Sequence, residues 1–451
     1  MESKKYVIEK LGAFGEGVAH DDGKVVFIKG ALPGEVVLAQ PELVKKSFTK
    51  AKLIKVLEPR PDRIKPLCKY IEECGGCSLQ HLSYDAQLKL KVQTVKETLL
   101  KVGSIDVEID KAVPSKNILR YRNKLSFPVR GKRVGMYAEN SHNVVDIDDC
   151  LLQKEWNVEL IKALRQFMKD FKLSGYNEKS GDIRHIVARE KNGSKCITLV
   201  TSEHIKVNGF IDYIPFDNYV LYQNVNSQNN NVILSDEFYL IGGKGVYPDF
   251  HPASFYQVND DIEEALYADV LSECEGGNVV DAYCGAGNLT LMIASKANFV
   301  YGIEICKQAV YEAKERANNR KIWNAEFICG DCKTEFLTLS KKIKEKNNAN
   351  QTDNGGEMSE LLDKCKESDG VNADKEITVV FDPPRKGVDE STLVAALELA
   401  PQKIVYVSCN PATLARDLKT LLPAYTIQKI NIYDMFPQTK HVETMIVLQR
   451  K

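Results

Sequence analysis

Residues 279–291, VVDAYCGAGNLTL, join a short apolar run to a glycine-containing turn and then to a second apolar segment. The first run has the length of a buried strand and ends near Asp281. Gly285 and Gly287 allow the backbone to approach a ligand closely, and the N–H groups at the start of a following helix are free to bind polar groups. A strand, a glycine turn and a helix in this order predict one part of a doubly wound α/β sheet.

Further apolar runs follow toward the C-terminus: FVYGIE, AEFICG, ITVVFD and KIVYVS, mostly separated by segments of helical pattern. Alternating strands and helices predict a largely parallel sheet, so residues 251–451 are expected to form a Rossmann-like α/β domain. The last two runs, YTIQKINIY and ETMIVLQ, have no helix between them and predict an antiparallel pair at the end of the sheet. The polar, Asn- and Gly-rich residues 341–376 predict a mobile insertion.

The first 250 residues have a different pattern. Residues 1–59 alternate short apolar runs with turn signals, which predicts a small β-barrel that ends at a proline-containing linker. Residues 60–250 are expected to form a mixed central domain. Residues 44–66 carry eight Lys/Arg and two Asp/Glu, a net charge of +6. Such a stretch can neutralise phosphates, although a solvated strand face and linker is an equally good interpretation.

The whole chain has 451 residues, a net charge of −1 and 43% hydrophobic residues. These values are ordinary for a globular protein of two or three domains. No apolar run reaches the ~18 residues of a membrane span, and the first ten residues lack the apolar core of a signal peptide. We therefore expect a cytoplasmic protein, in which cysteines stay reduced and serve as metal ligands or catalytic groups.

Acidic residues recur at the ends of the predicted strands. Glu304 ends the strand after the glycine turn, 17 residues beyond Gly287, where a carboxylate can accept hydrogen bonds from ribose hydroxyls. Asp331 follows the third strand and could bind an adenine amino group. Thr290 occupies the third glycine position of dinucleotide-binding turns. Together these features fit S-adenosylmethionine better than NAD.

Two more strand ends carry groups that suggest chemistry. Asp382 ends the fourth strand in FDPPRKG, where two prolines make a rigid turn. Amino-group methyltransferases have an aromatic residue after a similar turn, whereas this chain has Arg385, which disfavours an exocyclic amine as the substrate. Cys409 ends the fifth strand at the start of a helix, where a partly accessible thiol is expected to have a lowered pKa and to be nucleophilic. The alternative for Cys409 is an inert, buried cysteine.

A nucleophilic thiolate is needed when the methyl acceptor is a carbon atom. Addition of the thiolate to C6 of a pyrimidine makes C5 able to attack the methyl group of the donor. A base must then remove the C5 proton so that the thiol can leave. Glu443, in the sequence HVETM, is the candidate base, and His441 is the second candidate.

A second group of cysteines suggests a metal site. Cys68, Cys74 and Cys77 form a C-x5-C-x2-C pattern, and Cys150 lies farther along the chain. A structural zinc site would usually have a second close pair, whereas three clustered cysteines with a distant fourth favour a 4Fe-4S cluster. Zinc and unligated thiols are the alternatives.

The motifs SFYQVN, DAYCGAGN, FDPPRKG, SCNPATLARDL and HVETM resemble those of the RNA uracil-5-methyltransferase family, and the likeness covers nearly the whole chain. The resemblance implies that Cys409 is the nucleophile, Glu443 the base and S-adenosyl-L-methionine the methyl donor. It also implies an N-terminal RNA-binding TRAM domain and points to the 4Fe-4S cluster. The cofactor-binding residues that it implies are Gln257, Tyr283, Asn288, Glu304 and Asp331, with Asp382 in the turn after the fourth strand.

The sequence therefore predicts a monomeric enzyme that makes 5-methyluridine from a uridine flipped out of RNA. The cysteine pattern and the TRAM domain resemble the branch that modifies 23S rRNA, and the T-loop uridine of tRNA is the alternative substrate. A non-catalytic iron–sulfur RNA-binding protein is disfavoured because Cys409 and Glu443 are both present. A cytosine C5-methyltransferase usually has its nucleophile in a Pro-Cys turn at the fourth strand, where this chain has no cysteine.

Overall fold

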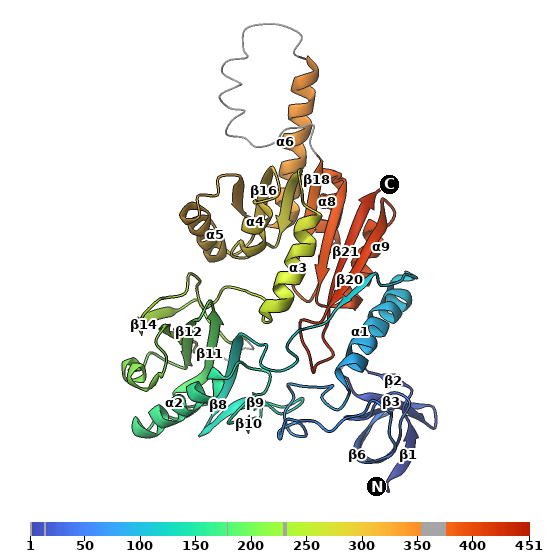
Figure 1. Cartoon of the computed structure of the whole chain (residues 1–451), viewed down its shortest axis with the longest axis vertical. Helices are drawn as coiled ribbons and strands as arrows, with labels where there is room; N and C mark the ends of the chain where they lie inside the picture. The colour runs from blue at the N-terminus through green and yellow to red at the C-terminus, as the bar shows by residue number, and fades with distance from the viewer. Residues whose placement is uncertain (1, 13–14, 178, 229–231, 353–375) are drawn as a thin grey trace. The chain divides into compact units, whose positions relative to one another are not determined.

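The computed structural model describes residues 2–12, 15–177, 179–228, 232–352 and 376–451 (Figure 1). The chain forms two compact units, each built from separate segments of the sequence. Unit 1 contains residues 1–91, 116–253 and 436–440, and unit 2 contains residues 92–115, 254–435 and 441–451. The predicted three-domain boundaries near residues 59 and 250 remain predictions.

The first sheet of unit 1 is built from short strands joined by tight turns. Its six strands follow the order β1-β5-β6-β4-β3-β2, and only β4 and β6 pair in parallel. Alternate side chains, such as Val26 and Ile28 on β4, enter one apolar core. The strands are β1 (Lys4–Val7), β2 (Lys10–Leu11), β3 (Gly17–Asp21), β4 (Lys24–Ile28), β5 (Val36–Val44) and β6 (Phe48–Glu58).

A buried ion pair ties the segment after this sheet back to it. Glu35 is fully buried, and its carboxylate accepts hydrogen bonds from Arg63 Nε at 2.5 Å, Arg63 Nη2 at 2.7 Å and the Leu32 N–H at 2.9 Å. Burial acts to raise the pKa of Glu35, but the hydrogen bonds from Arg63 and Leu32 outweigh it and lower the pKa. Glu35 therefore stays charged, with donors in place of water.

The second sheet of unit 1 has seven strands in the order β10-β9-β8-β11-β12-β13-β14. Only β12 and β13 pair in parallel. The helices α2 (Trp156–Asp170) and η2 (Asn208–Tyr213) share its apolar core, where the ring centroids of Phe167 and Phe210 lie 5.1 Å apart. The strands are β8 (Lys124–Arg130), β9 (Arg133–Tyr137), β10 (Val144–Asp146), β11 (Ile183–Lys191), β12 (Ser194–Thr201), β13 (Tyr219–Val225) and β14 (Phe238–Lys244).

Unit 2 contains an eight-stranded sheet in the order β17-β16-β15-β18-β19-β21-β20-β7. The five strands from β17 to β19 are parallel, which confirms the predicted parallel sheet. The strands are β7 (Lys111–Val113), β15 (Asn278–Ala282), β16 (Phe299–Glu304), β17 (Ala325–Cys329), β18 (Ile377–Phe381), β19 (Lys403–Ser408), β20 (Tyr425–Tyr433) and β21 (Glu443–Arg450).

The predicted antiparallel pair is present, but it does not form the end of this sheet. β21 pairs antiparallel with both β19 and β20. β7, from a much earlier part of the chain, then pairs in parallel with β20 and forms the edge. The expected position was wrong because pairing with β7 is a long-range contact that no local pattern records.

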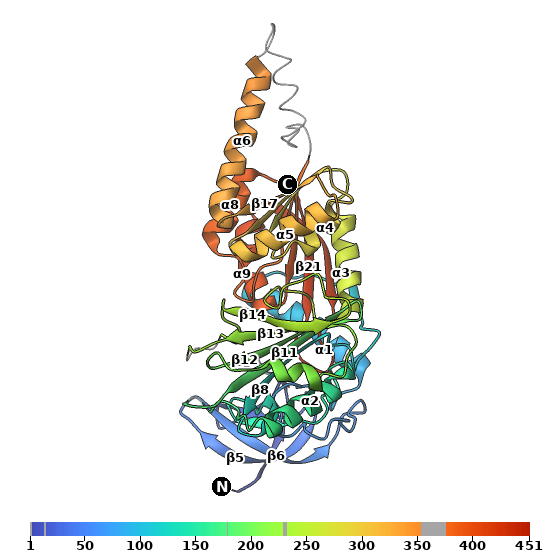
Figure 2. The same cartoon turned by 90° about the vertical axis from the view of Figure 1, so that its left-hand side faces the viewer.

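Helices cover both faces of the unit 2 sheet, with α4 and α5 on one face and α6, α8 and α9 on the other (Figure 2). Phe336 of α6, Leu393 of α8 and Leu414 of α9 share one apolar cluster with the central strands. Leu291 of α4 and Val310 of α5 form a second cluster. The helices are α3 (Asp260–Ser272), α4 (Asn288–Ile293), α5 (Lys307–Asn319), α6 (Cys332–Thr352), α8 (Glu390–Leu399) and α9 (Pro411–Leu421).

The segments of helical pattern differ in how far they extend. α1 (Tyr84–Thr98) continues as the π-helix η1 (Leu99–Gly103). The predicted mobile insertion at residues 341–376 begins within α6, because Lys and Glu, which are good helix formers, continue the helix from residue 341 to residue 346, and the helix ends at Thr352. Residues 353–375 of that prediction lie outside the described residues. No helix in the described part of the chain is long and apolar enough to cross a membrane.

Candidate active site

The parallel strands of unit 2 all end along the edge of the sheet that is formed by their carboxyl ends, and predicted site residues follow them. Ala282 at the end of β15 pairs with Ile303 of β16 and with Phe381 of β18, so these strands end level with one another. Ligand sites of open α/β sheets lie at this edge. The site residues there are Tyr283 after β15, Glu304 at the end of β16, Asp331 after β17, Asp382 after β18 and Cys409 after β19.

The turn between β15 and α4 depends on left-handed backbone conformations. The φ angles are +65° at Tyr283, +54° at Gly285 and +74° at Gly287. A Cβ atom on Gly287 would lie 2.7 Å from the Phe327 ring and 3.0 Å from the Ala313 side chain. This position therefore requires glycine for space as well as for conformation.

Glu304 is oriented by two backbone N–H groups. Gly285 donates to its Oε2 at 3.1 Å, and Cys306 donates to its Oε1 at 2.8 Å. Each carboxylate oxygen keeps a second lone pair that can accept a ribose hydroxyl. Asp331 is exposed at the start of α6, where its Oδ1 accepts a hydrogen bond from the Thr334 N–H at 3.4 Å. Both carboxylates thus lie at the sheet edge with acceptor capacity.

The other predicted cofactor-binding residues are partly engaged by the protein. Asn288 accepts a hydrogen bond from Arg316 and donates to the Phe255 carbonyl at 3.4 Å. Gln257 is buried. Tyr283 is half-buried, and burial raises the pKa of its hydroxyl, which therefore stays protonated. Asn288 thus connects the glycine turn to α5 and to the segment that carries Phe255 and Gln257.

Three carboxyl groups accompany these residues: Asp281 and Glu443 are buried, and Asp382 is half-buried. Burial raises the pKa of Asp281 to about 7; the Thr290 hydroxyl, 2.5 Å from Oδ2, opposes this shift, and Asp382 and Glu304 add to it. Burial also raises the pKa of Asp382 to about 7. Burial and then Asp382 raise the pKa of Glu443 well above its ordinary value, and Arg385 opposes them. The site therefore keeps protons on carboxyl groups near neutral pH.

The three carboxyl groups differ in their hydrogen bonding. Asp281 is bound by Thr290. In contrast, the side chains of Asp382 and Glu443 accept no hydrogen bond from any described residue. Neither Asp281 nor Arg385 was among the predicted site residues, although each lies within a motif that was identified, DAYCGAGN and FDPPRKG respectively. Acids with a raised pKa and no hydrogen-bond donor are candidates for exchanging protons with a substrate.

Cys409 is partly exposed between β19 and α9. Burial raises the pKa of its thiol to about 11, Glu443 raises it further, and Arg385 lowers it. The predicted lowering of the thiol pKa by the helix start is therefore wrong, because desolvation and the neighbouring acid outweigh it. Glu443 and Asp382 both raise the pKa of Cys409, and Asp382 also raises that of Glu443, so the structure brings these three residues together. His441, the second candidate base, lies two residues before β21.

The four predicted metal-ligating cysteines lie in unit 1 and are described separately. The Gly76 N–H donates to Cys74 Sγ at 3.3 Å, and Gln80 Nε2 donates to Cys77 Sγ at 3.2 Å. Burial raises the pKa of Cys77 to about 12, and the other three thiols add to the increase. The thiols are thus close enough to affect one another. In the described residues, however, no three His, Cys, Asp or Glu side chains are arranged to hold a metal ion, so the structure does not show the predicted cluster.

Two known protein families match the chain. Residues 226–451 match the tRNA (Uracil-5-)-methyltransferase family, and residues 7–54 match the TRAM domain. The chain belongs to the tRNA (uracil-5-)-methyltransferase family. The predicted family and the predicted N-terminal TRAM domain are thereby confirmed.

The similarity to individual proteins extends over the whole chain. The chain is 38% identical to an uncharacterized RNA methyltransferase of Clostridium tetani (strain Massachusetts / E88), over 98% of this chain and 95% of the relative. It is 36% identical to an uncharacterized RNA methyltransferase of Caldanaerobacter subterraneus subsp. tengcongensis, over 99% of this chain and 98% of the relative. The crystal structure of the Pyrococcus abyssi tRNA (uracil-54, C5)-methyltransferase with S-adenosyl-L-homocysteine matches with a TM-score of 0.74 and 27% identity, over 98% and 99% of the chains. The chain is therefore an S-adenosylmethionine-dependent RNA (uracil-5-)-methyltransferase.

The raised pKa values predict how the reaction depends on pH. A group with a raised pKa is protonated below that pKa, so the thiolate fraction of Cys409 should grow about tenfold for each pH unit up to its pKa near 11. The single-turnover rate of methyl transfer should therefore rise steadily between about pH 6.5 and 8.5. Rapid-quench assays with methyl-labelled donor, at constant ionic strength, measure this slope. A rate that does not change over this range would contradict the prediction.

Proposed function

We propose that this enzyme forms 5-methyluridine through a covalent bond between Cys409 and C6 of the target uracil. The observation that carries the proposal is the grouping of Cys409 with Glu443, Asp382 and Arg385: all three shift the pKa of Cys409, and Asp382 and Arg385 also shift the pKa of Glu443. The nucleophile must be a thiolate and the base a carboxylate, and Arg385 favours both charged forms. S-adenosylmethionine supplies the methyl group, and its positive charge acts in the same direction as Arg385.

The first and last of three steps each use one side chain, and the middle step is the methyl transfer from the donor. The thiolate of Cys409 bonds to C6 of uracil, and the electron pair of the C5–C6 double bond moves toward C5 and the O4 carbonyl. C5 bonds to the donor methyl group as the methyl–sulfur bond of the donor breaks, which leaves S-adenosylhomocysteine. Glu443 takes the C5 proton, the C5–C6 double bond forms again, and the C6–sulfur bond breaks to return the thiolate. The uridine must leave the RNA stack to reach the partly exposed Cys409 and the buried Glu443.

The main residues proposed to bind the cofactor lie at the same edge of the sheet, where the parallel strands end. We propose that Glu304 accepts the ribose hydroxyls and that Asp331 binds the adenine amino group. Asp382 raises the pKa of both Asp281 and Glu443. This supports a position for Asp382 between the cofactor site and the proposed base, close to the donor methyl group. The remaining proposed contacts come from Gln257, Tyr283 and Asn288.

Two variants test the covalent mechanism. RNA with 5-fluorouridine at the target should form a stable adduct with the enzyme, because fluorine cannot leave C5 as a proton does, and Cys409→Ala should abolish this adduct. Glu443→Gln should transfer one methyl group to ordinary RNA and then stall, with turnover lower by about 10²–10⁴-fold. Denaturing gels with methyl-labelled donor should show a labelled protein–RNA band for Glu443→Gln.

The control for these variants is Cys306→Ala, which removes an exposed thiol of the same unit and should leave the adduct intact. An undiminished adduct in Cys409→Ala would assign the nucleophile elsewhere. Normal turnover, or no labelled band, in Glu443→Gln would exclude Glu443 as the base and leave His441 as the next candidate.

We propose 23S rRNA as the substrate. The C-x5-C-x2-C pattern together with the TRAM domain supports this choice. Transfer RNA is the second candidate, because the similar Pyrococcus abyssi enzyme is a tRNA (uracil-54, C5)-methyltransferase. A cytoplasmic location and a monomeric state remain predictions.

Methyl transfer to purified RNAs separates the two substrates. We expect label from the donor in unmodified 23S rRNA, and only background label in unmodified tRNA at the same molar concentration. RNA from a deletion strain should correspondingly lack 5-methyluridine in 23S rRNA and retain it in tRNA. The reverse pattern in either experiment would assign the enzyme to tRNA.

We also propose that Cys68, Cys74, Cys77 and Cys150 hold a 4Fe-4S cluster with a structural role. The donor set supports it, because four thiolates are soft ligands that suit iron–sulfur clusters and do not suit magnesium or calcium. The N–H groups directed at the sulfurs of Cys74 and Cys77 also fit, because cluster thiolates accept such bonds.

Metal analysis tests this proposal. Protein purified without oxygen should be brown and contain about four irons and four sulfides per chain. Cys74→Ser and Cys77→Ser should lose this colour, whereas Cys196→Ala, which removes the thiol on β12 of the same unit, should keep it. Zinc without sulfide in anaerobic protein would contradict the cluster.

A further inference from the structure

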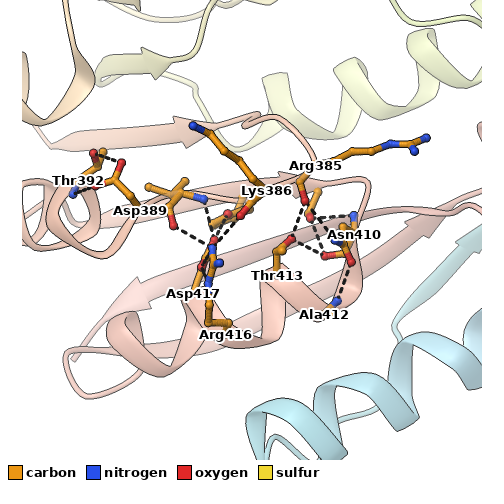
Figure 3. Close-up of polar contacts among 12 residues, drawn as sticks. Arg385, Lys386, Asp389, Thr392, Asn410, Ala412, Thr413, Arg416 and Asp417 are labelled. Atoms are coloured by element: carbon orange, nitrogen blue, oxygen red, sulfur yellow. Dashed lines mark hydrogen bonds and ion pairs between the residues drawn. The ribbon is translucent and has the colours of Figure 1, made fainter. Parts of the chain in front are cut away.

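One face of α9 binds the turn that follows β18 (Figure 3). This turn, residues 382–388, is called the proline turn below. Asn410 Nδ2 donates to the Arg385 carbonyl at 3.1 Å, and Thr413 Oγ1 donates to the same carbonyl at 3.4 Å. Asn410 also caps α9, because its side chain accepts a hydrogen bond from the Ala412 N–H at 3.1 Å. The start of α9 therefore holds the first half of the turn.

The next turn of α9 holds the second half. Arg416 Nη2 donates to the Lys386 carbonyl at 2.9 Å and to the Val388 carbonyl at 3.1 Å. The turn also has an internal hydrogen bond, from the Gly387 N–H to the Pro384 carbonyl at 2.8 Å. Three carbonyl groups of the proline turn are thus bound by side chains of a single helix.

Asp417 completes the arrangement from the buried side. Its side chain is 1% exposed. Oδ2 accepts hydrogen bonds from the Val388 N–H at 2.9 Å and from the Tyr406 hydroxyl at 2.6 Å, and Oδ1 accepts one from Arg416 Nε at 2.7 Å. A buried carboxylate is tolerated when its oxygens have such donors. Asp417 therefore joins α9, β19 and the proline turn.

The fit between the proline turn and α9 leaves no spare space. Gly387 has a φ of +75°. A Cβ atom there would lie 2.5 Å from Asp417 Oδ2 and 2.7 Å from Arg416 Nη2. The two charged side chains therefore contact the turn backbone directly, and a shift of either would displace it.

We propose that Asp417, acting with Arg416, is a positioning residue that fixes the proline turn relative to the nucleophile. The inference rests on the proposed role of Cys409. Cys409 comes directly before the cap of α9, whereas Asp382 and Arg385 are carried by the proline turn. Because one helix follows the nucleophile and also binds the turn, Asp417 sets the spacing between the thiol and the two ionisable groups of the turn, Asp382 and Arg385. Asp417 itself contacts no reacting atom.

Asp417→Asn tests this role with little change of shape. The amide group of asparagine has one acceptor oxygen and one NH2 group. Its NH2 group must therefore face either Arg416 or the Val388 N–H and the Tyr406 hydroxyl, all of which are donors to Asp417. Displacement of reacting groups by about 1 Å can cost about 10²-fold in rate. We expect the single-turnover rate of adduct formation with 5-fluorouridine RNA, per cofactor-binding site, to fall by about this factor, with unchanged affinities for S-adenosylmethionine and RNA.

Two further variants keep the test decisive. Lys419→Ala changes an exposed residue of α9 that does not bind the turn, and it should react at the wild-type rate. Arg416→Ala removes two bonds to the turn from a side chain that is 54% exposed, and it decides the question if Asp417→Asn does not fold. A wild-type rate in Asp417→Asn, or in Arg416→Ala where that variant decides, would overturn the inference.

The same measurements separate this inference from the proposed function. A loss of rate that only follows a loss of affinity for S-adenosylmethionine would indicate general unfolding of the site and would also overturn the positioning role. If Cys409→Ala still formed the adduct, the proposed nucleophile would be wrong, whatever the result at Asp417. If Cys409→Ala abolished the adduct and Asp417→Asn reacted normally, only the positioning role would fail.

Discussion

The burial of acids at the edge of a parallel sheet is the constraint on which this site depends. Desolvation raises the pKa of Asp382, which is half-buried, and of Glu443, which is buried, and Asp382 adds to the shift at Glu443. Glu35 and Asp417 are also buried, but arginine and backbone donors saturate their oxygens. The contrast separates acids that hold the fold together from acids that can take up or release a proton. In the proposed mechanism, the positive charge of bound S-adenosylmethionine favours the ionised forms of acids of the second kind, such as Glu443.

Much of the catalytic unit was predictable from local patterns. Apolar runs of strand length, each followed by a Gly, acidic or Cys residue, predict parallel strands whose ends form one site, and Glu304, Asp382 and Cys409 lie there. The thiol pKa was not predictable, because it depends on burial and on Glu443, which is distant in the sequence. The pairing of β7 with β20 was not predictable for the same reason, because the two strands are distant in the sequence. The hydrogen bonds between α9 and the proline turn could not be predicted either, since Arg416 and Asp417 look like ordinary polar residues of an amphipathic helix.

The sequence pattern and the structure gave different information about the cysteines of unit 1. Spacing alone favours four ligands for one cluster, and the structure adds directed N–H donors at two of the sulfurs. Segment 436–440 belongs to the same unit: the Ser78 and Leu79 N–H groups donate to the Gln438 carbonyl at 3.1 and 3.0 Å. Gln438 has a φ of +69°, so these bonds hold a strained residue. The loop that begins at the cysteines therefore also orders a segment just before the predicted base.

The position of β21 has a consequence for synthesis of the protein. The ribosome makes this strand after every other strand described, yet it lies between β19 and β20 and carries Glu443 at its start. Until residues 443–450 have emerged, β19 and β20 each present an unpaired edge, which invites pairing with other chains. A nascent chain that stops before this strand therefore lacks both the strand that joins β19 to β20 and the proposed base.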